Sequence, residues 1–246
     1  MRTLLIVPML LVPLIAQAEV TVSTVTVRSG FYRAPDCTPT AEPEVYNECV
    51  CQANIRKPQV SGLAPDVVTS INSALAQLPE KLAEESCEGT PTGAPVGGLK
   101  VNLASSDYEV TYQTPTVLTV LTKYSTYGTG SEHALEGTEG QTFELVHGQV
   151  VDPVAGLKPA QLKKIDGVIK QELLKKYPTE LFEETKARTE PFLNENGCDS
   201  CTIFYGKAGW MVRFQVFSIA PYALGEPEIA LPADLLPAPD KLIVKG

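Results

Sequence analysis

Hydrophobic and polar residues alternate along several segments of this chain, and the alternation predicts strands. The first such segment starts at Glu19, where EVTVSTVTV places valines two residues apart. Because successive side chains of a strand point to opposite faces of a sheet, this period indicates strands with one buried face. Further strand-like segments cover residues 46–61, 106–113, 116–127, 142–146, 149–151, 201–205, 210–217 and 228–231.

Spacings of three and four residues predict two longer helices. Pro65 opens the first, since proline is tolerated in a first helical turn, and Pro79 is expected to kink or end it. The second follows Gly156-Leu157, and a shorter helical piece is predicted at residues 179–188. The apolar stripes are Val68, Ile71, Leu75, Leu78 and Leu82 in the first helix, and Leu162, Ile165, Ile169 and Leu173 in the second.

Glycine, proline and polar residues cluster between these segments and predict loops. The loops are expected at residues 30–48, 88–98 and 128–140, and a tight hairpin turn is expected at His147-Gly148. Strands outnumber helices in this pattern, which predicts an α+β fold.

The segment FQVFSIAPYALGEPEIAL, residues 214–231, predicts a binding surface. Pro221 cannot donate to a sheet and restricts Ala220, so the strand is expected to end there. Tyr222 then lies on a stiff rim, and Gly225 turns the chain into the last strand. The alternative is a plain strand corner in which Tyr222 packs inward.

The N-terminal residues 1–18 predict a cleavable secretory signal. Arg2 precedes a short apolar run, and Ala16-Gln17-Ala18 supplies small residues for cleavage. The run is too short for a membrane span of about 20 residues, and Glu19 stands where a lipid-anchored protein has cysteine. We therefore expect an exported protein, periplasmic or secreted, without a membrane anchor.

All six cysteines follow the predicted signal. An even number in an exported chain predicts disulfides, and the sequence does not choose among the fifteen pairings. Asp199 and a following strand make a redox-active Cys-x-x-Cys pair unfavourable, so the pair at 198–201 is interpreted as a loop staple. The cysteines are Cys37, Cys49, Cys51, Cys87, Cys198 and Cys201.

The net charge is −9, which disfavours nucleic acid as a partner, since its phosphates need a basic face. Loss of Arg2 with the signal leaves 19 basic and 29 acidic residues, a net charge of −10. An acidic surface attracts basic partners, and solubility alone is the other explanation.

The sequence offers no convincing catalytic or metal site, so we predict neither an enzyme nor a cofactor. His133, with Glu132 and Glu136 nearby, would suit a metal only on a helix, and its glycine-rich surroundings disfavour a helix. Ser131 lies too close to His133 in sequence to form a catalytic pair. Trp210, the only tryptophan, is interpreted as a core residue.

Three segments resemble the extracytoplasmic domain of RsiV-type anti-sigma factors, which respond to lysozyme. A similar domain precedes the catalytic part of some peptidoglycan deacetylases and stands alone in many exported bacterial proteins. The segments are residues 58–75, residues 117–156 and IAPYALG at 219–225, of which the last is the most specific. The loop at 130–134 departs from the family's Gly-Ala-His-Gly word, and residues 152–156 lack its threonine.

The resemblance implies a two-lobed α+β fold, with an antiparallel sheet and helices packed on one face. It divides the chain into the signal (1–18), a disulfide-rich segment (19–54) and an RsiV-like domain (55–240). It implies a non-enzymatic domain that recognises a lysozyme-like hydrolase through Pro221, Tyr222, Gly225, Tyr127 and His133. The alternative is a peptidoglycan or carbohydrate module in which Tyr124, Tyr127 and Tyr222 stack on sugars. No oligomeric state is indicated.

Overall fold

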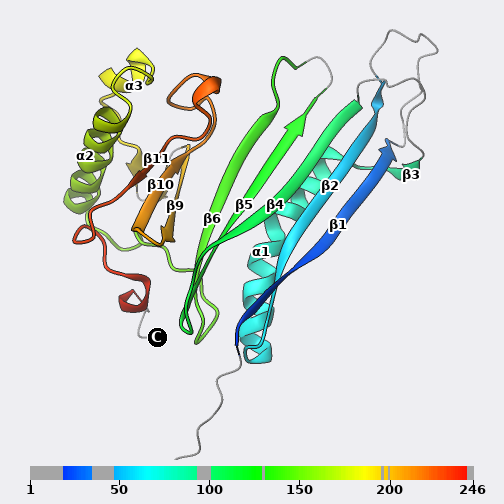
Figure 1. Cartoon of the computed structure of the whole chain (residues 1–246), viewed down its shortest axis with the longest axis horizontal. Coiled ribbons are helices and arrows are strands. Elements are labelled where there is room, and N and C mark those ends of the chain that lie inside the picture. The colour runs from blue at the N-terminus through cyan, green and yellow to red at the C-terminus, as the bar shows by residue number, and fades with distance from the viewer. Residues whose placement is uncertain are drawn as a thin grey trace, which may run out of the picture.

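A computed structural model describes residues 19–34, 47–92, 101–128, 131–194, 197–198 and 200–242. The predicted signal at 1–18, Cys37 and the side chain of Cys49 lie outside the described part. Within that part the fold is α+β, as predicted, with a large sheet, a small sheet and helices packed against them (Figure 1).

The large sheet has six strands in the order β3-β1-β2-β4-β5-β6. The alternating segments at its centre are confirmed as strands. They form β1 (Thr21–Arg33), β2 (Asn47–Ser61), β3 (Thr90–Thr92), β4 (Val101–Gln113), β5 (Val117–Tyr127) and β6 (Leu135–Glu144).

One pair of neighbouring strands makes this sheet mixed and not purely antiparallel. β2 and β4 run parallel, while the other pairs are antiparallel. Helix α1 (Pro65–Ser86) lies between them in sequence, and a parallel connection needs such a crossover to return the chain to the same end of the sheet. The prediction of an antiparallel sheet is therefore wrong for the pair β2 and β4 and holds for the other pairs.

Helix α1 covers one face of the large sheet (Figure 1). Its Ile71 and Leu75 pack against Leu118 of β5 and Phe143 of β6, all at most 1 % exposed. Pro79 does not end the helix, which continues to Ser86. The buried residues of α1 are Val67, Ile71, Leu75, Ala76, Pro79, Leu82 and Ala83, so Val68 and Leu78 of the predicted stripe are only half-buried.

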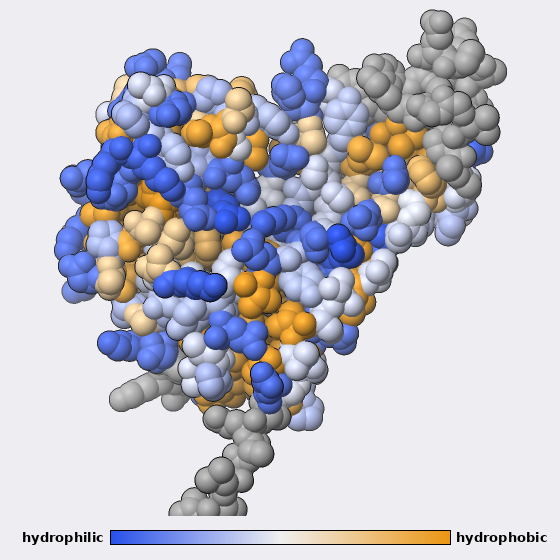
Figure 2. Space-filling model, in the orientation of Figure 1, coloured by the Kyte–Doolittle hydropathy of each residue, from blue (hydrophilic) through white to orange (hydrophobic). Residues whose placement is uncertain are grey.

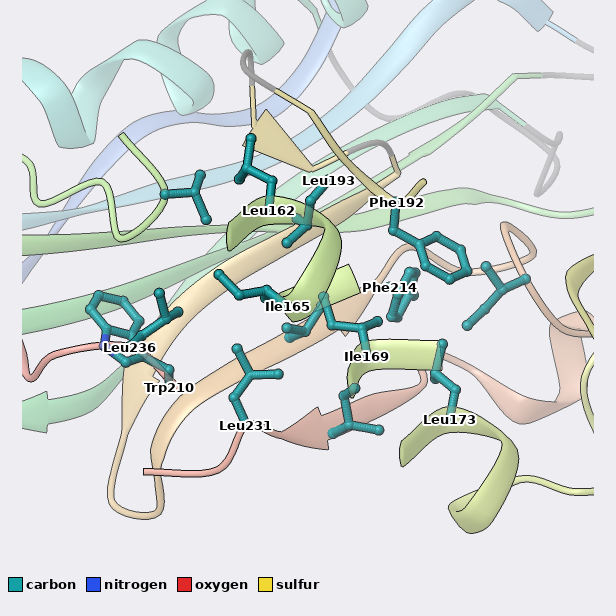
Figure 3. Packing of buried hydrophobic residues seen from close by; sticks show 14 of the residues in the cluster. Leu162, Ile165, Ile169, Leu173, Phe192, Leu193, Trp210, Phe214, Leu231 and Leu236 are labelled. Carbon is teal, nitrogen blue, oxygen red and sulfur yellow. The ribbon is translucent and has the colours of Figure 1, made fainter. Parts of the chain in front are cut away.

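The small lobe consists of a three-stranded sheet, β9-β10-β11, and the helices beside it. Its core packs α2 against this sheet (Figure 3). All four predicted core positions of α2 are buried, and Trp210 is buried with them. The elements are α2 (Pro159–Lys176), α3 (Glu183–Ala187), β7 (Leu193–Asn194), β8 (Gly197–Cys198), β9 (Cys201–Gly206), β10 (Gly209–Phe214), η1 (Tyr222–Leu224), β11 (Glu228–Ala230) and η2 (Pro239–Lys241).

Several predicted element boundaries are wrong, and β3 and the start of β4 also lie outside the predicted strands. β1 continues to Arg33, and β6 begins at Leu135, within what the glycines at 128–140 predicted as loop. Both strands pair along their length, and the ladder outweighs the local preference of glycine for turns. Strand β10 ends at Phe214, because Gln215 turns out of the small sheet to contact β6.

The predicted hairpin at His147-Gly148 is a turn with little strand after it. β6 ends at Glu144, and a single bridge joins Phe143 to Val150. The Glu144 carboxylate is 2 % exposed and accepts the backbone N–H groups of Val146, His147 and Gln149 at 2.9–3.2 Å. A buried carboxylate thus holds the turn together.

Two disulfides lie within the described part. Cys51 of β2 bonds to Cys87 at the end of α1, and Cys198 bonds to Cys201. The second confirms the interpretation of the Cys-x-x-Cys pair as a staple. Residues 21–33 and 47–54 belong to the large sheet, and the predicted boundary between residues 54 and 55 stays a prediction.

Ile169→Ala should lower the free energy of unfolding by about 2–5 kcal/mol, because it opens a cavity in the core of the small lobe. Ile169 is 0 % exposed there. Urea denaturation followed by Trp210 fluorescence measures this change in the same core. The control, Val150→Ala, removes a side chain that is 50 % exposed and should change stability by about 0.5 kcal/mol or less. Equal midpoints for the two variants would contradict this assignment of the core.

Candidate functional site

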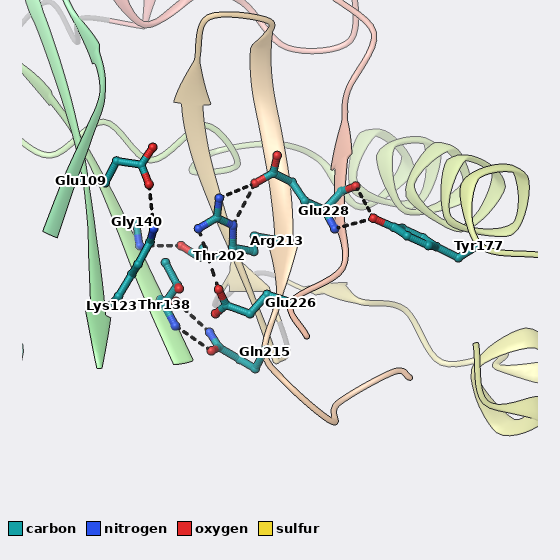
Figure 4. Close-up of polar contacts among 10 residues, drawn as sticks. All are labelled: Glu109, Lys123, Thr138, Gly140, Tyr177, Thr202, Arg213, Gln215, Glu226 and Glu228. Atoms are coloured by element: carbon teal, nitrogen blue, oxygen red, sulfur yellow. Dashed lines mark hydrogen bonds and ion pairs between the residues drawn. The ribbon is translucent and has the colours of Figure 1, made fainter. Parts of the chain in front are cut away.

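The small lobe is joined to the large sheet along strand β6, mainly through side chains. Gln215 follows β10 and pairs with both backbone groups of Thr138, accepting its N–H at 2.9 Å and donating to its C=O at 2.8 Å. Thr202 accepts the N–H of Gly140 at 2.8 Å. These contacts occupy the outer edge of the large sheet and hold the two lobes together (Figure 4).

Gly140 is a glycine because the lobes meet tightly at this point. A Cβ atom at position 140 would lie 2.9 Å from atoms of Leu121, Phe204 and Thr202, closer than carbon atoms can pack. Gly140, one of the glycines that suggested a loop at residues 128–140, therefore serves a close approach of two strands.

The segment between β10 and β11 forms a loop fixed at several points. The carbonyl of Ile219 accepts the N–H of Phe182 at 3.1 Å and the hydroxyl of Thr185 at 3.0 Å. Residues 222–224 form the 3-10 turn η1, and Gly225 has φ of 71°, a conformation that favours glycine. The predicted turn at Gly225 is present, and the loop is held rigidly on the small lobe.

His133 and Tyr222 stack on one another, although they are far apart in sequence. Their ring centroids are 4.6 Å apart and the rings are inclined by 18°. His133 precedes β6 of the large sheet, whereas Tyr222 belongs to η1 of the small lobe. The two candidate residues therefore meet across the junction between the lobes.

The carboxylate of Glu136 belongs to this contact through its effect on the Tyr222 hydroxyl. Loss of solvent around the phenol, followed by the interaction with the negatively charged Glu136, raises the pKa of Tyr222. Tyr222 is half-buried, while His133 and Glu136 are exposed. The cluster is thus a solvent-facing rim with an aromatic centre, which we call the aromatic rim.

The other predicted site residues lie around the rim in different ways. Pro221 is exposed beside Tyr222, and Gly225 lines a groove on the large sheet. Tyr127 lies at the end of β5, half-buried, and pairs in register with Leu103 of β4. Its described contacts do not join it to the rim.

A groove runs from the rim across the face of the large sheet opposite α1. Its volume is about 450 Å³, and the loop after β10 forms one wall through Val216, Gly225 and Glu226. Figure 2 shows hydrophilic residues across the middle of this face, with hydrophobic patches above and below. The groove is predominantly polar where the strands form its floor.

Charged side chains of this face are paired with one another. Arg56 contacts Asp107 at 2.9 Å, and Lys123 contacts Glu109 at 2.8 Å. The hydrogen bond from Lys123 is the main cause that lowers the pKa of Glu109. These two pairs balance the charges of Arg56 and Lys123, and Glu136 and Glu226 add carboxylates to the lining of the groove.

Phe217 is an exposed aromatic residue that the sequence reasoning missed. It was predicted in the strand 210–217, yet its side chain is 64 % exposed and its φ is 63°. Its ring packs edge-on against Phe182 at 5.5 Å. Phe217 is out of phase with the alternation of Val212 and Phe214, which is the one sequence signal against a strand. Glu136 and Gln215 had no such signal.

The structure groups no metal-binding set among the residues it describes. No cluster of three histidine, cysteine or acidic residues is placed to hold an ion in those ranges. His147 and His133 lie in different parts of the fold, since His147 lies beside Glu144 in the turn after β6.

Comparison with known proteins supports the fold. No protein-family model and no curated protein matches the chain by sequence. A DUF3298 family member from Bacteroides fragilis superposes with a TM-score of 0.58 and 14% identity, covering 92% of this chain and 97% of the other. A DUF3298 family protein from Pseudomonas aeruginosa gives 0.51 and 12%, covering 89% and 93%.

The chain therefore has the two-lobed α+β fold of these DUF3298 proteins, the family of the RsiV-type domain. At 14% and 12% sequence identity, the similarity establishes a shared fold. The resemblance to the RsiV-type domain that the sequence predicted is therefore confirmed for the fold. Neither α1 nor any other helix in the described ranges is both long and apolar enough to cross a bilayer.

Gln215→Ala should loosen the junction between the lobes, because it removes both hydrogen bonds to Thr138. We expect a local loss of about 1–3 kcal/mol and faster hydrogen exchange at the Thr138 amide, measured by NMR. Gln141→Ala is the control, since Gln141 lies on the same strand and reaches Ala74 of α1. Unchanged exchange at Thr138 in the Gln215 variant would contradict the role of this pair.

Glu136→Gln should lower the pKa of Tyr222, because it removes the negative charge that disfavours the phenolate. A raised folded-state pKa means that protonated Tyr222 stabilises the fold below the ordinary tyrosine pKa of about 10. This contribution is lost as the pH rises through the folded-state pKa, and in the variant it is lost at lower pH. An NMR titration of the Tyr222 ring measures the change, with Glu132→Gln as control. An equal pKa in protein and variant would remove Glu136 from the rim.

Proposed function

We propose that this protein is an exported, non-enzymatic domain that binds a basic protein, in particular a lysozyme-like cell-wall hydrolase. The observation that carries the proposal is the stack of His133 on Tyr222 at the junction of the lobes. An aromatic pair held by both lobes presents a preformed surface, which reduces the entropy lost on binding. Pro221 and Phe217 extend that surface with exposed apolar groups.

The charge distribution supports a basic partner at the rim. The chain carries a net charge of −9, and Glu132 and Glu136 are exposed beside His133. Positive charge gathers elsewhere, on the outer face of α2, where Lys163, Lys164, Lys175 and Lys176 are exposed. A basic enzyme is therefore steered toward the rim and away from α2.

The disulfides support a location outside the cytoplasm. Cys51–Cys87 and Cys198–Cys201 are bonded pairs, and such bonds persist in oxidising compartments. We place the protein in the periplasm or the external medium, where a cell-wall hydrolase acts. Binding there either inhibits the enzyme or senses it.

Surface plasmon resonance with egg-white lysozyme as the probe tests the proposal. We expect saturable binding that weakens steeply as salt rises, because opposite charges bring the two proteins together. Tyr222→Ala should raise Kd by about tenfold or more, since aromatic anchors commonly contribute about 2 kcal/mol.

Tyr32→Ala is the matched control, because Tyr32 lies on β1, away from β5 and β6 in the sheet. It should bind lysozyme as the unmodified protein does. Circular dichroism of both variants establishes that they are folded. Absence of lysozyme binding, or equal Kd values for a folded Tyr222→Ala and the unmodified protein, would refute the proposal.

A further inference from the structure

The groove across the large sheet is separate from the aromatic rim in its chemistry. It runs over four adjacent strands, β2, β4, β5 and β6, through residues such as Asn54, Ser105, Ser125 and Thr138. Adjacent strands are spaced by about 4.8 Å, so the floor is about 15 Å long. It is long enough for a short chain molecule.

Three groove residues carry buried polar atoms without a hydrogen-bond partner. They are Arg56 Nε, Thr138 Oγ1 and Glu226 Oε1, the unpartnered buried side-chain atoms of the described residues. Buried polar groups are normally satisfied, and each one left alone costs about 1–3 kcal/mol. Their concentration in a single groove indicates that a polar ligand completes it.

Other atoms of the same residues are already engaged, which fixes their positions. Arg56 Nη2 bonds to Asp107, Glu226 Oε2 lies 3.9 Å from Arg213 Nη1, and Gln215 occupies the backbone of Thr138. The Arg56 and Glu226 side chains are 40% and 22% exposed. Both side chains therefore line the groove with part of their surface open to solvent.

The chemistry of the groove favours an uncharged ligand that both donates and accepts hydrogen bonds. Arg56 is paired with Asp107 and Lys123 with Glu109, while the carboxylates of Glu136 and Glu226 also line the groove, so an anion gains little there. Arg56 Nε donates, Glu226 Oε1 accepts, and Thr138 Oγ1 does either. Hydroxyl groups of a sugar meet all three requirements.

An extended peptide suits this groove less well than a sugar. Peptides commonly add as a strand at a free sheet edge, where backbone groups are unpaired. The groove instead crosses β2, β4 and β5, whose backbone groups are paired on both sides, and β6, whose outer edge is occupied by Gln215 and Thr202. We propose that it binds a short, uncharged oligosaccharide, independently of protein docking at the rim.

An NMR titration of the full protein tests this site with three uncharged tetrasaccharides: chitotetraose, cellotetraose and maltotetraose. We expect at least one to give saturable shifts at the amides of Ser105, Ser125 and Thr138. Absence of saturable shifts with all three overturns the proposal. Tighter binding of an anionic tetrasaccharide, tetragalacturonate, overturns it as well.

Two substitutions test the recognition atoms. Thr138→Val and Glu226→Leu should each raise the Kd of the bound sugar about tenfold, because each removes the side-chain group that hydrogen-bonds to the sugar. Thr122→Val is the control, since Thr122 is a buried threonine of β5 that does not line the groove. A folded Thr138→Val protein with unchanged affinity overturns the proposal. The sugar titration contains no lysozyme. A negative result in that titration therefore does not bear on the measurement of lysozyme binding at the aromatic rim.

Discussion

The outer edge of strand β6 is the constraint on which the arrangement of the protein depends. Gln215 occupies both backbone groups of Thr138, and Thr202 accepts the amide of Gly140. These bonds satisfy an edge that would otherwise be open to another chain. They also set the position of the loop after β10, and with it the aromatic rim and one wall of the groove.

The sequence predicted the regular elements well where periodicity and burial agree. The four core positions of α2 and the central strands β4 and β5 follow the expected patterns. Boundaries were missed where tertiary contact overrides local preference. Glycines at 137 and 140 indicated a loop, but they are strand positions where Tyr124 and Phe204 leave no room for a Cβ atom. The parallel pairing of β2 and β4 was missed for a similar reason, since alternation alone does not specify strand direction.

The candidate site was predictable only in part. The Pro-Tyr segment and His133 were singled out separately, and the structure brings Tyr222 and His133 into contact. Glu136 was noted in the sequence only as a neighbour of His133 and Gln215 was not noted at all, because their roles depend on which strand edge faces which lobe. The groove is invisible in the sequence for the same reason: its lining comes from four strands and a loop.

The bond between Cys51 and Cys87 has a consequence for how the chain folds. It links β2 to the end of α1, across a sequence separation of 36 residues, before the chain reaches β4. Parallel pairing of β2 with β4 is non-local, and such contacts slow folding because loop closure must come first. An early disulfide shortens that search by tying the crossover helix to the strand. Oxidation would then govern the rate at which the sheet centre assembles, as well as the stability of the finished sheet.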